Sequence, residues 1–170
     1  ISASTEETVK SAIWHLIFDA FFEEVFAWNE ALPEEEKFAI SVKTRLGLED
    51  AEEFEEILPI YNQYPLKEVI IHPRVRRDFY KGTPDYDAFA KALELCKHEV
   101  CYNGDIFTKE DYVNLTKRFR DIDKIMLGRG IIANPGLVRE IRTGEKITKD
   151  ELRLYHDKLY DGYLADLGAE

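Results

Sequence analysis

Four clusters of polar residues each follow a short apolar run, and together they could bind an anionic cofactor. Lysine, histidine and arginine supply positive charge, and glycines let backbone N–H groups approach an anion closely. A helix beginning near Asn134 or Pro135 would add the positive end of its dipole. The last two clusters are therefore predicted to hold a phosphate group, although an isolated GRG is more often a turn. The clusters are KTRLG at 43–47, HPRVRR at 72–77, NGD at 103–105 and GRG at 128–130.

The segment 72–81 combines positive charge with an aromatic residue. It holds four bases and one acid, which gives +3 with His72 neutral, and it includes Tyr80. Such a patch offers phosphate contacts and base stacking. The net charge of the chain, −11, argues against nucleic acid, but residues 1–60 hold 15 acids and 4 bases while residues 61–170 hold 19 of each. The excess acid therefore lies in the first third, away from the basic segment.

The apolar runs that precede these clusters are predicted to be buried strands, because Val and Ile dominate them. Each run is followed by a helical pattern, so the order strand–helix occurs four times and predicts a parallel sheet with right-handed crossovers. Capping boxes start helices at Thr108 and Thr148, and Gly144 is a helix stop. The last helix is predicted to turn Leu152, Tyr155, Leu159 and Tyr163 inward. The predicted strands are residues 38–42, 68–71, 99–102 and 124–127.

Eight such units close an α/β TIM barrel, (β/α)8, whose active sites lie at the carboxyl ends of the strands. Four units make half a barrel and would leave two strand edges unpaired, which predicts missing sequence or a partner. No apolar stretch is long enough to span a bilayer, and the polar N-terminus is not a signal peptide. Cys96 and Cys101 fit neither a metal site nor a disulfide framework. These features favour a cytoplasmic protein with free thiols and no metal.

The motifs SVKTRLG, HPRVRRDFYKG, YNGDI and MLGRGIIANPG, in this order and spacing, resemble the tRNA-dihydrouridine synthase family over about residues 38–144. The resemblance implies an FMN-binding barrel of which strands 5–8 are present here and the N-terminal half is missing. Residues 1–144 would be the partial barrel and residues 145–170 the start of a C-terminal helical segment. The implied activity is reduction of uridine to 5,6-dihydrouridine in tRNA, with NADPH as the reductant.

The resemblance also assigns roles to particular residues. Lys43 and His72 would contact the flavin ring system, where a cation stabilises the reduced ring. The alternatives are a salt bridge inside the barrel for Lys43 and a core histidine bonded to a carbonyl for His72. The ribityl phosphate would be held by Asn103, Gly104, Asp105, Gly128 and Arg129. The residues expected to lie toward the RNA are Arg74, Arg76 and Tyr80.

The chain also departs from the family pattern. The family's catalytic cysteine lies on a loop after its fourth strand, and no such loop is present, while Cys96 and Cys101 have the pattern of core residues. No catalytic residue is therefore assigned, and the chain alone is expected to be inactive.

Residues 4–16 and 17–28 resemble the helices after the family's third and fourth strands. We therefore expect a further segment between Leu16 and Ile17, the alternative being one helix from about Thr5 to Ala31. Two rival functions stay open: an FMN-dependent barrel that reduces a small molecule, and an inactive half-barrel fragment. The sequence does not fix the oligomeric state.

Overall fold

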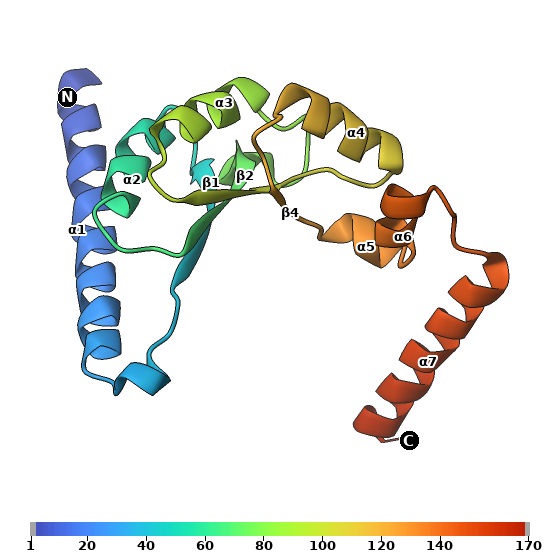
Figure 1. The fold of residues 1–170 in the computed structure, drawn as a ribbon. Helices are drawn as coiled ribbons and strands as arrows, with labels where there is room; N and C mark the ends of the chain where they lie inside the picture. Colours follow the sequence, from blue (N-terminus) through green and yellow to red (C-terminus); the bar gives the residue numbers. More distant parts are fainter. Residues whose placement is uncertain (1–2, 169–170) are drawn as a thin grey trace. The chain divides into compact units, whose positions relative to one another are not determined.

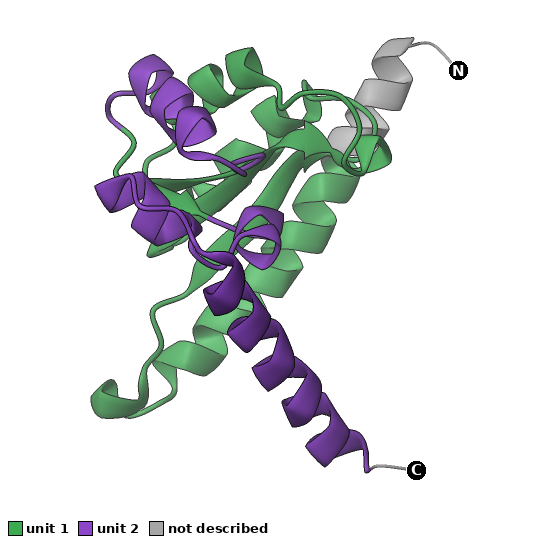
Figure 2. Cartoon of the chain, turned by 90° about the vertical axis from the view of Figure 1, so that its right-hand side faces the viewer, with its two compact units in different colours: residues 1–103, 122–126 green, residues 104–121, 127–170 purple. Residues whose placement is uncertain are grey.

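The computed structural model describes residues 3–168, which divide into two compact units, coloured separately in Figure 2. The first unit is Ile1–Asn103 with Ile122–Met126, and it contains the sheet. The second is Gly104–Asp121 with Leu127–Glu170, and it contains the C-terminal helices. None of the described helices is long and apolar enough to cross a membrane.

The first unit is built on a four-stranded parallel sheet whose strands follow one another in chain order (Figure 1). This confirms the predicted topology. In one row across the sheet, Lys43 pairs with Ile70, Ile70 with Cys101, and Cys101 with Lys124. The strands are β1 (Ser41–Gly47), β2 (Glu68–Val75), β3 (Glu99–Asn103) and β4 (Lys124–Met126).

The first two strands differ from their predicted limits. β1 begins at Ser41 instead of residue 38 and continues to Gly47, and β2 continues to Val75 instead of ending at residue 71. Lys43 and His72 therefore lie inside strands, and the prediction that they follow strand ends is wrong. The physical reason is that both strands contain polar residues, Lys43, Thr44 and Arg45 in β1 and the buried His72 and Arg74 in β2, whereas the prediction required apolar residues on both faces.

Two helices cover one face of the sheet and enclose the core. α2 (Glu53–Tyr61) packs on β1, and α3 (Tyr86–Leu95) packs on β2. Apolar side chains recur on one side of each helix, and Phe54, Leu58 and Phe89 are buried, as their helical spacing predicts. The ring of Tyr102, in β3, meets Phe89 edge-on with centroids 5.1 Å apart. The core of the first unit therefore lies between the sheet and these helices.

The N-terminal helix α1 (Ala3–Glu30) lies against α2. It runs through Leu16 and Ile17 without interruption, and Trp14 stacks on Phe18 across this point with ring centroids 5.4 Å apart. The expectation of a further segment at this point is therefore wrong. The two apolar stripes stay in phase around the helix, so a single helix accommodates both.

The carboxyl end of α1 is tied to the chain that leads into the sheet. Phe22 is buried against Tyr64, with ring centroids 4.9 Å apart. Asn29, also buried, donates from Nδ2 to the carbonyl of Phe38 at 3.1 Å and accepts from the Phe38 N–H at 2.8 Å. A short 3-10 helix, η1 (Glu34–Glu36), lies between the two residues of this pair. The reciprocal bonds fix the return of the chain from α1 toward β1.

The second unit contains only helices and the loops between them. Thr108 and Asp111 form the predicted capping box, and Gly144 ends a helix with a left-handed φ of 81°. The helix expected at Asn134 or Pro135 begins at Leu137 instead, because the Asn134 side chain accepts from the Gly136 N–H and forms a turn there. The helices are α4 (Lys109–Arg118), α5 (Arg129–Ala133), α6 (Leu137–Thr143) and α7 (Lys149–Leu167).

The last helix, α7, begins at the capping box of Thr148 and Glu151, as predicted. Its apolar residues do not face inward, because every residue of the helix is exposed. The inward prediction is therefore wrong for Leu152, Tyr155, Leu159 and Tyr163, which are 41% to 66% exposed. Apolar periodicity shows that a helix has an apolar face, but it does not show which surface covers that face.

Candidate functional site

The sheet has one cationic face, formed by alternate residues of its first two strands. Thr44 points to the helical side, because its Oγ1 accepts from the Tyr61 hydroxyl of α2 at 3.2 Å. Successive residues of a strand point to opposite faces. Lys43 and Arg45 therefore lie on the other face, and His72 joins them because it is the register partner of Arg45.

Lys43 is exposed on this face and has no ion-pair partner among the residues that the structure describes. The pKa of its ammonium is lowered, first by partial burial and then by the charge of Arg45. The salt bridge considered for Lys43 is therefore not formed within the described chain. A cation that is partly desolvated and close to another cation suits an anionic ligand, such as the reduced ring of a flavin.

His72 is 5% exposed, and its Nε2 lies 3.2 Å from Nη1 of Arg74. A guanidinium can only donate, so Nε2 accepts and the ring proton of neutral His72 is on Nδ1. The Tyr80 ring lies nearly parallel to the imidazole, with centroids 6.4 Å apart. The partner of Nε2 is thus an arginine, and the burial of His72 agrees with the core histidine that was the alternative.

Arg74 is the largest fully buried side chain of the described residues, at 1% exposure. Its guanidinium donates from Nη2 to the carbonyl of Gly82 at 2.6 Å and from Nε to the carbonyl of Lys81 at 3.2 Å. These bonds close the loop that follows β2, which begins with the 3-10 helix η2 (Arg76–Asp78). In this position Arg74 supports the loop from inside, whereas Arg76 and Tyr80 are exposed on it.

Arg45 holds the same loop from β1. Its Nη1 donates to the carbonyl of Val75 at 2.8 Å and its Nη2 to the carbonyl of Phe79 at 2.7 Å. Its guanidinium also lies 5.5 Å from the centroid of the Tyr80 ring. Sequence reasoning did not single out Arg45. Its position two residues after Lys43, on the same strand face, is the signal that could have identified it.

In the second unit, Asp105 of the NGD cluster and Arg129 of the GRG cluster form an ion pair. Nη2 of Arg129 lies 2.6 Å from Oδ1 of Asp105, and the guanidinium stands 5.4 Å from the centroid of the Phe107 ring. A Cβ added to Gly128 would meet nothing within 4 Å. The backbone at Gly128 is therefore accessible beside an oriented cation, which fits a phosphate group.

The predicted cofactor residues are distributed over both compact units. Asn103 is the last residue of β3, and its Nδ2 donates to the carbonyl of Met126 in β4 at 2.9 Å. The structure pairs the strand of Lys43 with that of His72, and it joins Asp105 to Arg129. The convergence of the whole set on one site stays a prediction. Lys43, His72 and Asn103 belong to the first unit, and Gly104, Asp105, Gly128 and Arg129 belong to the second.

Neither cysteine has the position of the family's catalytic residue. Cys101 is buried in β3, and Cys96 directly follows α3. Burial raises the pKa of both thiols. Cys101 therefore fits the core role that the sequence indicated, whereas Cys96 is only half-buried.

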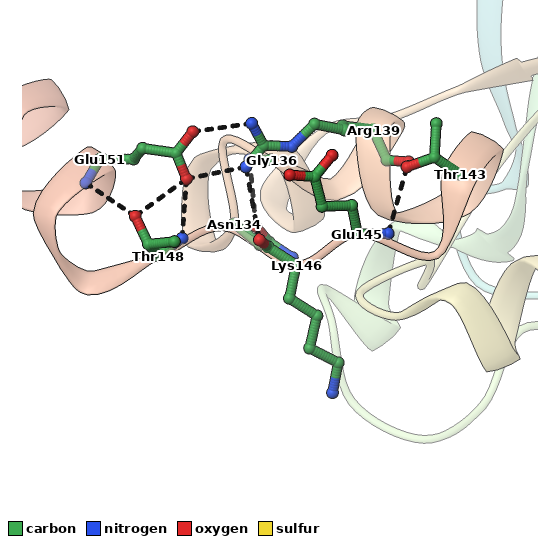
Figure 3. A network of polar contacts seen from close by, with 8 residues as sticks. All are labelled: Asn134, Gly136, Arg139, Thr143, Glu145, Lys146, Thr148 and Glu151. Atoms are coloured by element: carbon green, nitrogen blue, oxygen red, sulfur yellow. Dashed lines mark hydrogen bonds and ion pairs between the residues drawn. The ribbon is translucent and has the colours of Figure 1, made fainter.

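The start of α7 is fixed to α6 by the network in Figure 3. Arg139 donates to both carboxylate oxygens of Glu151, at 2.7 and 2.8 Å, and Glu151 also accepts from the N–H and the hydroxyl of Thr148. This guanidinium and these donors lower the pKa of Glu151 to about 2. The network stabilises the turn by which the chain leaves α6.

Comparison with known proteins identifies relatives of a large part of this chain. The family model "Dihydrouridine synthase (Dus)" matches residues 23–160. A tRNA-dihydrouridine(16) synthase of Aquipseudomonas alcaligenes is 29% identical over 110 residues, which cover 63% of this chain and 35% of the relative. The Shewanella oneidensis enzyme of the same name is 34% identical over 124 residues, covering 71% and 37%. A probable tRNA-dihydrouridine synthase 2 of Bacillus subtilis is 33% identical over 133 residues, covering 73% and 40%.

The matched region contains all four strands and every residue assigned to the cofactor or the RNA. The chain spans between 35% and 40% of the length of these three relatives. The family fold implies a TIM barrel, and the four parallel strands are part of one. By the extent of the family match and the order of its strands, the chain belongs to the dihydrouridine synthase family.

Proposed function

We propose that this chain is part of an FMN- and NADPH-dependent enzyme that reduces uridine to 5,6-dihydrouridine in tRNA. The observation that carries the proposal is Lys43, a partly desolvated cation on the polar face of a parallel sheet, in a chain of this family. In this proposal the strands are strands 5–8 of the barrel, and residues 145–170 begin a C-terminal helical domain. The enzyme would act in the cytoplasm, on tRNA.

Bound FMN would supply hydride-transfer chemistry, with NADPH as the source of reducing equivalents. Lys43 would stabilise negative charge on the flavin ring, and His72 would contact the same ring. Asp105 would orient the Arg129 guanidinium toward the phosphate, helped by their 2.6 Å ion pair. Asn103 and the backbone of Gly104 and Gly128 would complete the phosphate contacts.

The described residues do not include a cysteine on a loop after a strand, so this chain alone does not supply the proton that uracil needs. That group would come from another part of the intact enzyme. The chain by itself is therefore proposed to bind and orient rather than to complete the reaction. A barrel that reduces a small molecule is the rival function, and the basic loop after β2 counts against it.

The flavin assignment is tested with the full-length gene product. FMN is titrated while the flavin spectrum is recorded, and dihydrouridine in unmodified tRNA is measured by mass spectrometry. We expect Lys43→Met to weaken FMN binding about tenfold, as the loss of one charged contact predicts. Lys91→Met is the matched control, because Lys91 pairs with Glu55 on the helical side. A wild-type protein that forms no dihydrouridine with FMN and NADPH would refute the proposed function.

The RNA assignment is tested on the loop after β2. Arg76 and Tyr80 are proposed to contact tRNA, with Arg74 acting through the loop that it supports. Arg76→Ala should weaken tRNA binding without loss of FMN, and the difference should shrink as salt rises, because a phosphate contact acts through counterion release. Arg118→Ala in α4 is the control. Unchanged affinity of Arg76→Ala at low salt would remove Arg76 from the RNA surface.

A further inference from the structure

Phe79 has a strained backbone. Its φ is 50° and its ψ is −96°, and it is the only non-glycine residue of the described chain with a positive φ. Such a conformation in a residue with a bulky side chain is a genuine outlier, and it persists only when the surroundings hold it. Strain of this kind is a reason to look for a function at the residue.

Hydrogen bonds from several directions hold Phe79 in place. Arg45 donates to the Phe79 carbonyl at 2.7 Å, and the Phe79 N–H donates to the carbonyl of Arg76 at 3.1 Å. Arg74 donates hydrogen bonds to the carbonyls of Lys81 and Gly82, which follow Phe79 in the chain. The loop is therefore fixed on both sides of Phe79 by arginines that extend from the sheet.

The Phe79 side chain gains nothing from this arrangement within the described residues. It is 66% exposed, although a phenyl ring is among the side chains that gain most from burial. The loop is thus held by arginine contacts and presents an apolar ring to solvent. Tyr80, the next residue, is 59% exposed, and the same loop carries Arg76, Arg77 and Lys81, which are also exposed.

We propose that Phe79 is a base-stacking residue, on which an unpaired nucleobase of the RNA substrate lies. The proposal rests on the proposed function, and it adds a contact that neither the sequence motifs nor the family resemblance assigned. An exposed ring on a loop that also carries exposed cations matches the two parts of a single-stranded nucleotide, a flat base and a phosphate. Because the loop is already rigid, little conformational entropy is lost when the base binds.

The experiment uses the full-length gene product loaded with FMN, an unmodified tRNA transcript as the probe, and three substitutions. Phe79→Ala removes the ring, Phe79→Trp keeps an aromatic surface, and Phe79→Gly removes both the ring and the strain. Phe38→Ala is the matched control, because Phe38 is also exposed, at 60%, and stacks on Trp28. Binding is measured at low and at high salt, and FMN binding and the melting temperature are measured for every variant.

We expect Phe79→Ala and Phe79→Gly to bind tRNA roughly 5- to 150-fold more weakly, the range for loss of one stacked base. Phe79→Trp and Phe38→Ala should bind like the wild type, and FMN binding should not change. The loss in Phe79→Ala should persist at high salt, whereas that in Arg76→Ala should shrink, because stacking does not depend on counterion release. Phe79→Gly should melt at a higher temperature than Phe79→Ala, since glycine adopts positive φ freely.

Three results would overturn the inference. If the wild type binds tRNA and Phe79→Ala binds it equally well, Phe79 is not a stacking residue and the proposed function still stands. If Phe79→Ala and Phe79→Trp both melt several degrees below the wild type, the ring packs against protein in the intact enzyme. If the wild type does not bind tRNA at all, the proposed function fails, and the inference fails with it.

Discussion

Gly130, in the second unit, is a position at which an added methyl group has almost no room. It is buried in α5, and an ideal Cβ there would lie 1.9 Å from the carbonyl oxygen of Ile106 and 3.2 Å from Cδ2 of Leu137. Real Cβ contacts essentially never fall below 3.0 Å, so Gly130→Ala must separate α5 from the Ile106 backbone by about 1.1 Å. The atom in the way belongs to the backbone and cannot turn aside.

Two opposing effects decide the size of the change. Overpacking of a close contact costs typically 1–3 kcal/mol, and a clash with backbone belongs at the upper end, about 3 kcal/mol. Alanine in place of glycine inside a helix gains about 1 kcal/mol. The clash outweighs this gain, so Gly130→Ala should destabilise the protein by about 2 kcal/mol. With a urea m-value of about 2 kcal/mol/M, the unfolding midpoint should fall by about 1 M.

The measurement is urea unfolding followed by circular dichroism, with hydrogen exchange of residues 104–107 and 129–133 to locate the effect. Gly162→Ala is the matched control, because its Cβ would meet nothing within 4 Å and Gly162 lies inside the helix α7. We expect the control to be more stable than the wild type by up to about 1 kcal/mol, because alanine favours a helix over glycine. Equal midpoints for the two variants would show that α5 does not lie against Ile106, and the geometry of the GRG cluster would then be wrong.

Three further predictions concern Glu151, Asn29 and Phe79. The pKa of Glu151 is about 2, against an ordinary 4.5. The ionised carboxylate therefore stabilises the α6–α7 turn fully above pH 4.5, and this stabilisation is lost as the pH falls toward 2. Amide exchange of residues 148–151 should show this loss in the wild type and not in Glu151→Gln. Asn29→Ala removes both bonds to the Phe38 backbone and should cost about 2 kcal/mol in thermal unfolding, and an unchanged melting temperature would exclude the reciprocal pair. Phe79→Gly should be more stable than the wild type by about 1 kcal/mol, because it relieves a positive φ, and a lower stability would mean that Phe79 carries no strain.

The sequence determined the topology of the sheet, because that information is local. Each apolar run is long enough for one buried strand, and each is followed by a helix with its own start signal, so four parallel strands in chain order follow from pattern and handedness. The capping boxes at Thr108 and Thr148 and the stop at Gly144 were also readable, because they depend on residues three or four positions apart. The family was identifiable from four motifs for the same reason.

The strand limits and the roles of the arginines were decided only by the tertiary structure. Lys43 and His72 lie within strands because one face of the sheet is polar. The amino-acid sequence of a strand does not show which of its faces the helices cover. Arg74 and Arg76 are the same residue type in one basic segment, and the sequence does not distinguish their roles. Arg74 is nevertheless buried against the carbonyls of Lys81 and Gly82, whereas Arg76 is exposed. The difference comes from the fold of the loop, which brings those carbonyls back to the end of β2.

The backbone conformation of Phe79 is another feature that the sequence alone does not predict. Nothing in its residue type predicts a positive φ, since phenylalanine alone disfavours that conformation. A contact that holds the conformation comes from Arg45, more than thirty positions earlier, which donates to the Phe79 carbonyl from a neighbouring strand. Local sequence therefore determined which elements form and where the helices with capping boxes begin, whereas contacts between distant segments decided which side chains are held inside and which are presented to a ligand.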